Sequence, residues 1–145
     1  MKSKLIFNGK GHSTGIVKAQ AVVSRNPFGF WQGIDPKSGK VIDKRHDLVG
    51  QSLKGKIFIF PYGRGSTGTP GIFLEAVRNH AAPAAIINLK SEPMIVVCSL
   101  LAEEFYNVSI PIIDNLDKNP FEVIHTGDWL IVNGESGTVE IIAEK

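Results

Sequence analysis

The sequence is poor in residues that bind transition metals. It has one cysteine, Cys98, and one thiol can neither form an internal disulfide nor hold a zinc ion or an iron–sulfur cluster alone. Cys98 lies in the apolar run 94–102, so we interpret it as a buried core residue. The histidines lack the spacing of a metal site and are interpreted as surface or hydrogen-bonded groups: His12, His46, His80 and His125. We expect no metal bound by this chain. His46 follows three charged residues and is expected in a polar loop.

Long apolar runs are also missing. A membrane-spanning helix needs roughly 18 or more apolar residues in succession, and no run in this chain approaches that length. The first residues, MKSKLIFNGKG, turn polar before the core of a signal peptide could form. We therefore expect a cytoplasmic protein that does not enter a membrane.

The excess of one charge is small. Lys and Arg number 16 and Asp and Glu number 14, a formal net charge of +2 at pH 7. The basic residues are spread along the chain, without the basic stripe and interleaved aromatic residues of a nucleic-acid binder, so no nucleic-acid partner is expected. Hydrophobic residues are 43% of the 145 positions and charged residues 21%, as in ordinary globular proteins. We expect one domain over residues 1–145.

The N-terminal third is predicted to be rich in β-structure. Four apolar residues that recur with period two predict a half-buried strand: Val17, Ala19, Ala21 and Val23. The aromatic side chains of segment 27–33 form either part of the core or the wall of a pocket, and the core is the commoner use. The DPKSG sequence at 35–39 is a turn signal.

The middle of the chain is predicted to alternate strands and helices. Short apolar runs typical of strands covered on both faces occur at 56–60, 84–87 and 110–113. One helix is predicted with Thr69 as its N-cap and Pro70 at its first position, and a second over much of 96–106. Because such alternation implies right-handed crossovers, we expect a parallel sheet.

The end of the chain is predicted to return to β-structure. Apolar runs at 129–132 and 138–142 flank the sequence NGESG, which is a hairpin turn signal. The order along the chain is therefore strands, a β/α middle and strands again. The predicted fold class is α/β, as a single β/β/α domain without a linker.

The most informative segment is the glycine-rich loop GRGSTGT at 63–69. It lies between a predicted strand and a predicted helix, where open α/β sheets hold ligands. Glycines allow positive backbone angles and close approach of a ligand, and a helix amino terminus favours anions. Arg64 adds a guanidinium suited to a carboxylate or phosphate, and Ser66 and Thr67 add hydroxyl groups. The loop lacks the ending of a P-loop, so two interpretations stay open: an anion site, or a plain connection to a capped helix.

Ser66 would need help to take a proton, because serine is a poor base at neutral pH. Arg64 and the helix dipole can supply stabilising positive charge. This field explains why an arginine, glycines and a serine stand together, but it does not establish that they react.

A larger, ordered set of residues resembles a known family. In chain order the set comprises Gly33-Ile34-Asp35-Pro36, Gly39, Ile42-Asp43, His46, Gly50, Ser52, Gly55-Lys56, Gly63-Arg64-Gly65-Ser66-Thr67, Ala82-Pro83-Ala84-Ala85-Ile86-Ile87 and Glu92-Pro93. This set is similar to the small subunit, or swivel domain, of aconitase X, and the resemblance covers nearly the whole chain.

The resemblance implies a swivelling β/β/α domain that works with an aconitase X large subunit, which carries an iron–sulfur cluster and most of the substrate pocket. It implies a hydro-lyase reaction on a small hydroxy acid, of the cis-3-hydroxy-L-proline or mevalonate 5-phosphate class. By this similarity Ser66 is the catalytic base or a substrate ligand, Arg64 is the anion clamp, and Gly65 and Thr67 assist in binding substrate. The long, charged segment Leu101–Val108 favours a hydroxyproline-type member.

Two other functions remain open from the residues. One is a non-catalytic binding or regulatory module that kept the fold and the anion-binding loop. The other is a stand-alone enzyme, which the lack of metal ligands and of a second catalytic group disfavours. Arg64 and Ser66 favour the dehydratase subunit over the binding or regulatory module.

Overall fold

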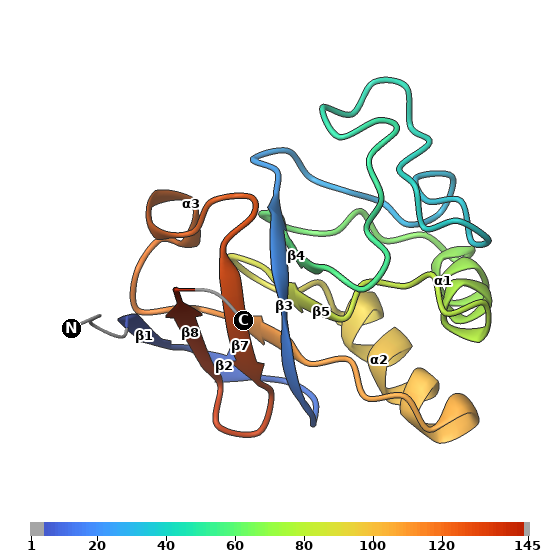
Figure 1. Cartoon of the computed structure of the whole chain (residues 1–145). Coiled ribbons are helices and arrows are strands. Elements are labelled where there is room, and N and C mark those ends of the chain that lie inside the picture. The colour runs from blue at the N-terminus through green and yellow to red at the C-terminus, as the bar shows by residue number, and fades with distance from the viewer. Residues whose placement is uncertain (1–4, 144–145) are drawn as a thin grey trace.

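The computed structural model describes residues 5–143, and its longest strand, β3 (Ile16–Val23), belongs to two different halves of one sheet. The first half of β3 pairs antiparallel with β7, from Ile16 opposite Asn133 to Gln20 opposite Trp129. Its last three residues pair parallel with β4, where Ala21 faces Ile57. The complete strand order is β1-β8-β7-β3-β4-β5-β6-β2 (Figure 1).

The antiparallel half is built from the two ends of the chain. Beside β3 it contains β7 (Trp129–Asn133), β8 (Thr138–Ile142) and β1 (Leu5–Asn8). The side-chain oxygen of Asn133 accepts hydrogen bonds from the N–H groups of Glu135 and Ser136, at 3.0 and 3.1 Å. Gly137 closes the turn with a φ of +73°, a conformation that favours glycine. The predicted hairpin is confirmed.

The parallel half carries the two long helices. Its strands are β4 (Ile57–Ile59), β5 (Ala85–Ile87) and β6 (Ile112–Asp114), and every residue in them is buried. The connections are α1 (Thr69–Arg78), between β4 and β5, and α2 (Pro93–Tyr106), between β5 and β6. Both helices lie on the same side of these strands and contact each other (Figure 1). The expected parallel sheet is confirmed.

The two edges of the sheet lie next to each other. β1 forms one edge and the short β2 (Lys10–Gly11), paired with β6, forms the other, yet only Gly9 separates them in the chain. A Cβ on Gly9 would lie 2.5 Å from the carbonyl oxygen of Asp114, so glycine permits this close crossing. The sheet is therefore nearly closed on itself.

The sheet separates two cores. The core beneath α1 and α2 is aromatic, with the Phe30 ring centroid 4.9 Å from that of Phe28 and 5.1 Å from that of Phe73. The core on the other face is aliphatic except for Phe121 of α3 (Pro120–Val123), and it also contains Ile124 at the end of that helix. Successive residues of β4 alternate between them, since Phe58 packs in the first and Ile59 in the second.

The predicted alternation of β3 holds only where one of its faces is covered. Ala19 and Ala21 are buried in the aliphatic core, as predicted. Val22 is also buried, in the aromatic core, because at this point β3 has entered the parallel half and both its faces are covered.

Two predicted boundaries differ from the structure. α2 begins at Pro93, three residues before the predicted start, because the Glu92 side chain accepts a hydrogen bond from the Met94 N–H (3.0 Å) and caps the helix. β6 begins at Ile112, since the Ile110 carbonyl is occupied by the hydroxyls of Ser13 (2.8 Å) and Ser99 (2.6 Å).

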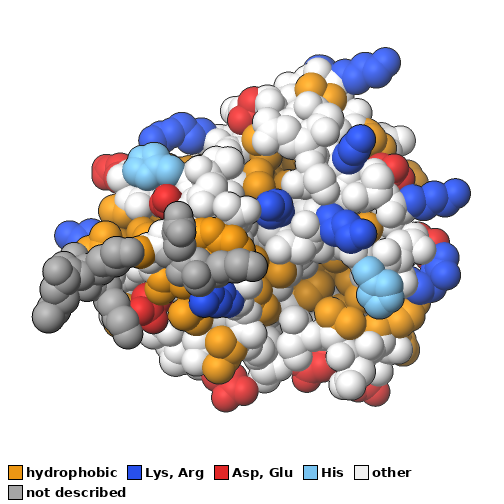
Figure 2. All heavy atoms as spheres, viewed as in Figure 1, with side chains coloured by type: hydrophobic (Ala, Val, Ile, Leu, Met, Phe, Trp, Pro, Cys, Tyr) orange, Lys and Arg blue, Asp and Glu red, His pale blue; other side chains and the backbone are white. Residues whose placement is uncertain are grey.

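The helices and the surface charges have two further properties. Within residues 5–143 no helix is both long and apolar enough to cross a membrane. On the face drawn in Figure 2, Lys and Arg side chains are interspersed with acidic and apolar ones.

Candidate functional site

The glycine-rich loop is fastened to the aromatic core. It leaves β4 through Phe60 and enters α1, so it lies at the carboxyl ends of the parallel strands. The Phe28 N–H donates to the Tyr62 carbonyl (3.3 Å), and the Arg64 N–H donates to the Phe28 carbonyl (3.0 Å). Because the Phe28 ring is buried, core packing sets the position of the loop.

The glycines of the loop serve close packing. Gly63, Gly65 and Gly68 all lack the positive φ that the sequence suggested. A Cβ on Gly65 would lie 3.1 Å from a carboxylate oxygen of Glu92, and one on Gly63 would lie 2.6 Å from the side chain of Ile95. A Cβ on Gly68 would overlap the indole of Trp31. Each glycine therefore lets a side chain from another segment rest on the loop backbone.

Ser66 lies at the amino end of α1. Its side-chain oxygen accepts a hydrogen bond from the Gly68 N–H (3.3 Å), and its carbonyl accepts one from the Thr69 N–H (3.0 Å). The hydroxyl is therefore next to a free helix terminus and a backbone donor, both of which stabilise negative charge on oxygen. The side chain is only partly buried, so a substrate can reach it.

The prediction of Thr69 as helix N-cap is wrong. α1 already includes Thr69, and Gly68 occupies the cap position without a side-chain hydrogen bond. The Thr69 hydroxyl is buried, and it has no hydrogen-bond partner among residues 5–143. The first turn instead uses the hydroxyl and carbonyl of Ser66 as its acceptors.

A polar cleft opens beside Ser66. Its volume is about 370 Å³, and three segments of the chain line it: Gly29, Trp31 and Gln32; Asp43 and Arg45; and Arg64, Gly65 and Ser66. The fold thus brings three of the four predicted site residues to one cleft. Thr67 is exposed and is not among the residues that line it.

The cleft also contains residues that were not predicted as site residues. Arg45 and Asp43 come from the polar segment after the predicted turn, and Gln32 stands beside the aromatic residues. For the aromatic side chains of segment 27–33, both predicted alternatives, core and pocket wall, are found. Phe28 and Phe30 belong to the core, whereas Trp31 is 45% exposed and lines the cleft. No spacing in the sequence links these residues to Ser66, since tertiary packing brings them there.

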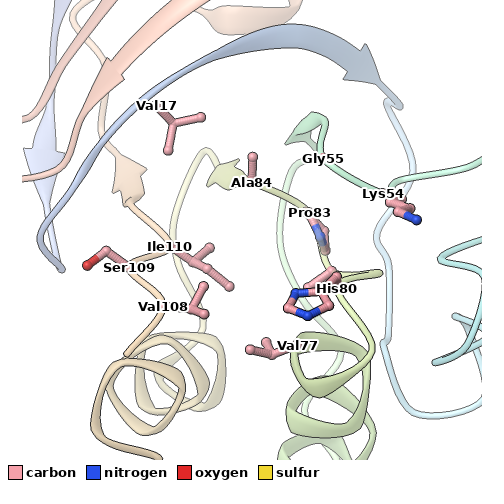
Figure 3. A pocket seen from close by; sticks show the side chains of 11 residues that line it. Val17, Lys54, Gly55, Val77, His80, Pro83, Ala84, Val108, Ser109 and Ile110 are labelled. Atoms are coloured by element: carbon pink, nitrogen blue, oxygen red, sulfur yellow. The ribbon is translucent and has the colours of Figure 1, made fainter. Parts of the chain in front are cut away.

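A second cavity, of about 350 Å³, lies at the opposite ends of the parallel strands. Figure 3 shows Val17, Val77, Val108 and Ile110 around it, with Lys54 and His80 at its rim. Its lining includes Ala84 and Ile110, which precede β5 and β6, so it adjoins the amino ends of these strands. Because ligands of α/β sheets gather at the carboxyl ends, and because the polar groups converge there, the cleft at Ser66 is the candidate site.

The buried cysteine and histidine serve the core. Cys98 is fully buried, and burial, assisted by the charge of Glu92, raises the pKa of its thiol to about 12. His46 lies in the polar loop, but its ring is buried edge-on to Phe28 at 5.3 Å, where Nδ1 accepts a hydrogen bond from the Leu48 N–H. Among residues 5–143, no group of three His, Cys, Asp or Glu side chains is arranged to hold a metal ion.

Comparison with known proteins connects this site to a family. The model of the aconitase X swivel domain matches residues 6–141. The phosphomevalonate dehydratase small subunit of Methanosarcina mazei is 38% identical over 138 residues, which cover 95% of this chain and 92% of the relative. Its counterpart from Methanocaldococcus jannaschii is 40% identical over 136 residues, covering 94% and 97%.

Solved structures agree with the sequence relatives. The crystal structure of Thermococcus kodakaraensis aconitase X in its holo form matches with a TM-score of 0.84 and 32% identity, over 95% of this chain and 98% of that one. The solution NMR structure of a UPF0107 protein matches with a TM-score of 0.83 and 35% identity, over 95% and 99%. The predicted α/β swivel fold is confirmed. The chain belongs to the aconitase X swivel-domain family, as a small subunit of its dehydratases.

Proposed function

We propose that this chain is the small subunit of a phosphomevalonate dehydratase, and that Ser66 and Arg64 act in a site completed by a large subunit. Relatives with that name from two archaea match this chain over nine tenths or more of their own length. Their name favours mevalonate 5-phosphate as the substrate, whereas the segment 101–108 favoured hydroxyproline. Within that segment Glu103 accepts a hydrogen bond from Thr14 (2.6 Å) and does not line the cleft.

The proposal rests on the observation that the cleft holds only some of the groups that a dehydration reaction needs. It offers one hydroxyl at a helix terminus, two guanidiniums and one carboxylate, that of Asp43, which already accepts a hydrogen bond from the Arg45 N–H (3.0 Å), but no second hydroxyl and no histidine. A site of this composition can hold an anion and take one proton. We therefore assign the groups that assist the departing hydroxyl to another chain, in agreement with the word subunit in the relatives' names.

In the proposed reaction, Ser66 acts as an alkoxide on the carbon next to the substrate carboxylate. Its oxygen takes a proton from that carbon, a carbon–carbon double bond forms, and the hydroxyl on the neighbouring carbon leaves as water after receiving a proton. The Gly68 N–H and the amino end of α1 stabilise the alkoxide before proton transfer. Arg64, two residues away, holds the carboxylate.

An iron–sulfur cluster does not fit the residues of this chain. A cluster needs several thiolates, whereas the single thiol here is buried, with its pKa raised to about 12. We therefore assign the family's expected cluster to the large subunit. The contribution of this chain is to bind, orient and deprotonate the substrate.

The test is activity of the assembled enzyme. The chain is co-expressed with the aconitase X large subunit from the same genome, and conversion of mevalonate 5-phosphate and of cis-3-hydroxy-L-proline is measured. Ser66→Ala should leave assembly intact and lower kcat roughly 10²- to 10⁴-fold. Ser136→Ala, in the exposed turn before β8, is the matched control and should keep full activity.

Each outcome separates the alternatives. Full activity of Ser66→Ala would remove the catalytic assignment. Failure to bind a large subunit would leave the binding or regulatory module as the better function. Conversion of hydroxyproline alone would keep the dehydratase but replace its substrate.

A further inference from the structure

The candidate cleft contains a second guanidinium that does not belong to the glycine-rich loop. Arg45 lines the cleft from the segment 43–48, which is far from Arg64 in the sequence. We propose that Arg45 is the phosphate-binding residue of this enzyme and that it selects phosphorylated substrates. The proposal rests on the proposed function and adds a substrate-discriminating residue to it.

The segment that carries Arg45 is anchored on both sides of this residue. On one side, Asp43 makes a turn, with its carboxylate accepting from the Arg45 N–H (3.0 Å) and its carbonyl from the His46 N–H (3.0 Å). On the other side, His46 and Leu48 are 7% and 5% exposed in the core. The backbone under the exposed Arg45 side chain is therefore held in place.

Asp47 holds the same segment through its side chain. Its carboxylate accepts hydrogen bonds from the Ser24 hydroxyl (2.7 Å) and the Asn26 side chain (2.9 Å). Burial by itself raises the pKa of Asp47, but these hydrogen bonds and the nearby His46 outweigh it and leave the pKa below its usual value. Asp47 is thus ionised at neutral pH, and it ties the segment to the end of β3.

The charges of the cleft suit an anion with two negative ends. Within residues 5–143, neither Arg45 nor Arg64 has an acidic partner within ion-pair distance, unlike Arg78, which pairs with Glu75. Asp43 is the one carboxylate that lines the cleft, so the three charged side chains sum to a single positive charge. A guanidinium without an acidic partner binds carboxylate or phosphate through two parallel hydrogen bonds.

The chemistry assigns the two arginines to different ends of the substrate. The carbon that loses its proton must lie at Ser66, and the carboxylate is attached to that carbon. Arg64 shares the loop of Ser66 and is therefore the carboxylate partner. The phosphate of phosphomevalonate is at the opposite end of its carbon chain and needs a cation from another segment, which Arg45 supplies. Hydroxyproline has no phosphate and gains nothing from Arg45.

The experiment uses the assembled two-subunit enzyme with Arg45→Gln. The KM for mevalonate 5-phosphate should rise roughly 10- to 100-fold, the loss expected for a charged hydrogen bond, while kcat stays within about twofold. Inhibition by inorganic phosphate should weaken in parallel, and Arg45→Lys should restore part of both. Lys44→Gln removes the same charge from an exposed neighbour that does not line the cleft, and it should leave KM near the wild-type value.

A fourth variant removes the negative charge of the cleft. Asp43→Asn keeps an oxygen acceptor for the Arg45 N–H but removes the opposing charge, so its KM should equal or fall below that of wild type.

Equal effects of Arg45→Gln and Lys44→Gln, or loss of kcat without a change in KM, would overturn the assignment of Arg45. If Ser66→Ala abolishes turnover while Arg45→Gln is normal, the proposed function stands and only this inference falls. An assembled enzyme that does not convert mevalonate 5-phosphate would refute this inference together with the proposed substrate.

Discussion

Cys98 is the side chain whose chemistry burial alters most. It is fully buried in the aromatic core, on the face of α2 that meets the sheet. Desolvation, with a smaller contribution from the charge of Glu92, raises the pKa of the thiol from 9.0 to about 12. The thiolate is therefore suppressed in the folded chain, which agrees with the interpretation of Cys98 as a core residue.

The raised pKa predicts how stability changes with alkaline pH. A thiol that resists ionisation only when folded contributes stability that is complete below pH 9.0 and is lost as pH rises toward about 12. Cys98→Ala should lower the free energy of unfolding by about 1 to 3 kcal/mol near neutral pH. This difference from wild type should shrink at about pH 10, as measured by urea unfolding. A difference that stays constant across this range would show that the folded thiol ionises normally.

At the scale of elements, the start of α1 depends on Ser66 and not on Thr69. Thr69 is 2% exposed, and its hydroxyl has no partner among the described residues. An unpaired buried hydroxyl costs free energy, whereas a capping hydroxyl would contribute about 1 kcal/mol. The two roles therefore predict opposite results for removal of the hydroxyl.

Thr69→Val should leave the free energy of unfolding unchanged or raise it by up to about 1 kcal/mol. Asn119→Ala is the control, because the Asn119 side chain accepts a hydrogen bond from the Phe121 N–H (3.0 Å) and caps α3. That control should lose about 1 kcal/mol in the same denaturant titration. A loss of similar size in Thr69→Val would restore Thr69 as a structural hydrogen-bonding residue.

The elements that were predicted well from sequence are those marked by neighbouring residues in the chain. The strands β4 and β5 follow from unbroken apolar runs, and the β7–β8 hairpin from its turn residues. The short strands β1 and β2 were not predicted individually, because their positions depend on partners more than 100 residues away, such as Ile141 and Asp114. Local patterns do not report such distant pairing.

The same distinction divides the candidate site. Arg64, Gly65 and Ser66 were predicted because they stand in one loop between a strand and a helix. Arg45 was missed, and for Trp31 a pocket wall was only the less common of two alternatives, since both residues enter the cleft only after the segments 27–33 and 43–48 fold over the aromatic core. The residues proposed from sequence are thus the part of the candidate site that is contiguous in the chain.

At the scale of the whole molecule, the cleft is open to solvent, and a large aromatic side chain lines it. Trp31 is 45% exposed, and it lies on Gly68 at the start of α1. The chain has only one other tryptophan, Trp129 in β7. The two indoles can therefore report separately on the cleft and on the antiparallel half of the sheet.

Assembly should change the surroundings of Trp31 and leave those of Trp129 as they are. With 5-fluorotryptophan incorporated only in the small subunit, the fluorine resonance of Trp31 should shift on addition of the large subunit. The resonances are assigned with Trp31→Phe and Trp129→Phe. A complex that forms without any shift of the Trp31 signal would place the subunit boundary away from the cleft.

The continuity of β3 has a mechanical consequence. A strand that is hydrogen-bonded to both halves of the sheet leaves no seam along which one half could rotate against the other. In the proposed enzyme, the cleft then opens and closes because the small subunit moves as one rigid body relative to the large subunit. Because the proposed small and large subunits are separate chains, the fraction of time that the large subunit covers the cleft depends on subunit affinity and concentration, so turnover per molecule should decline on dilution.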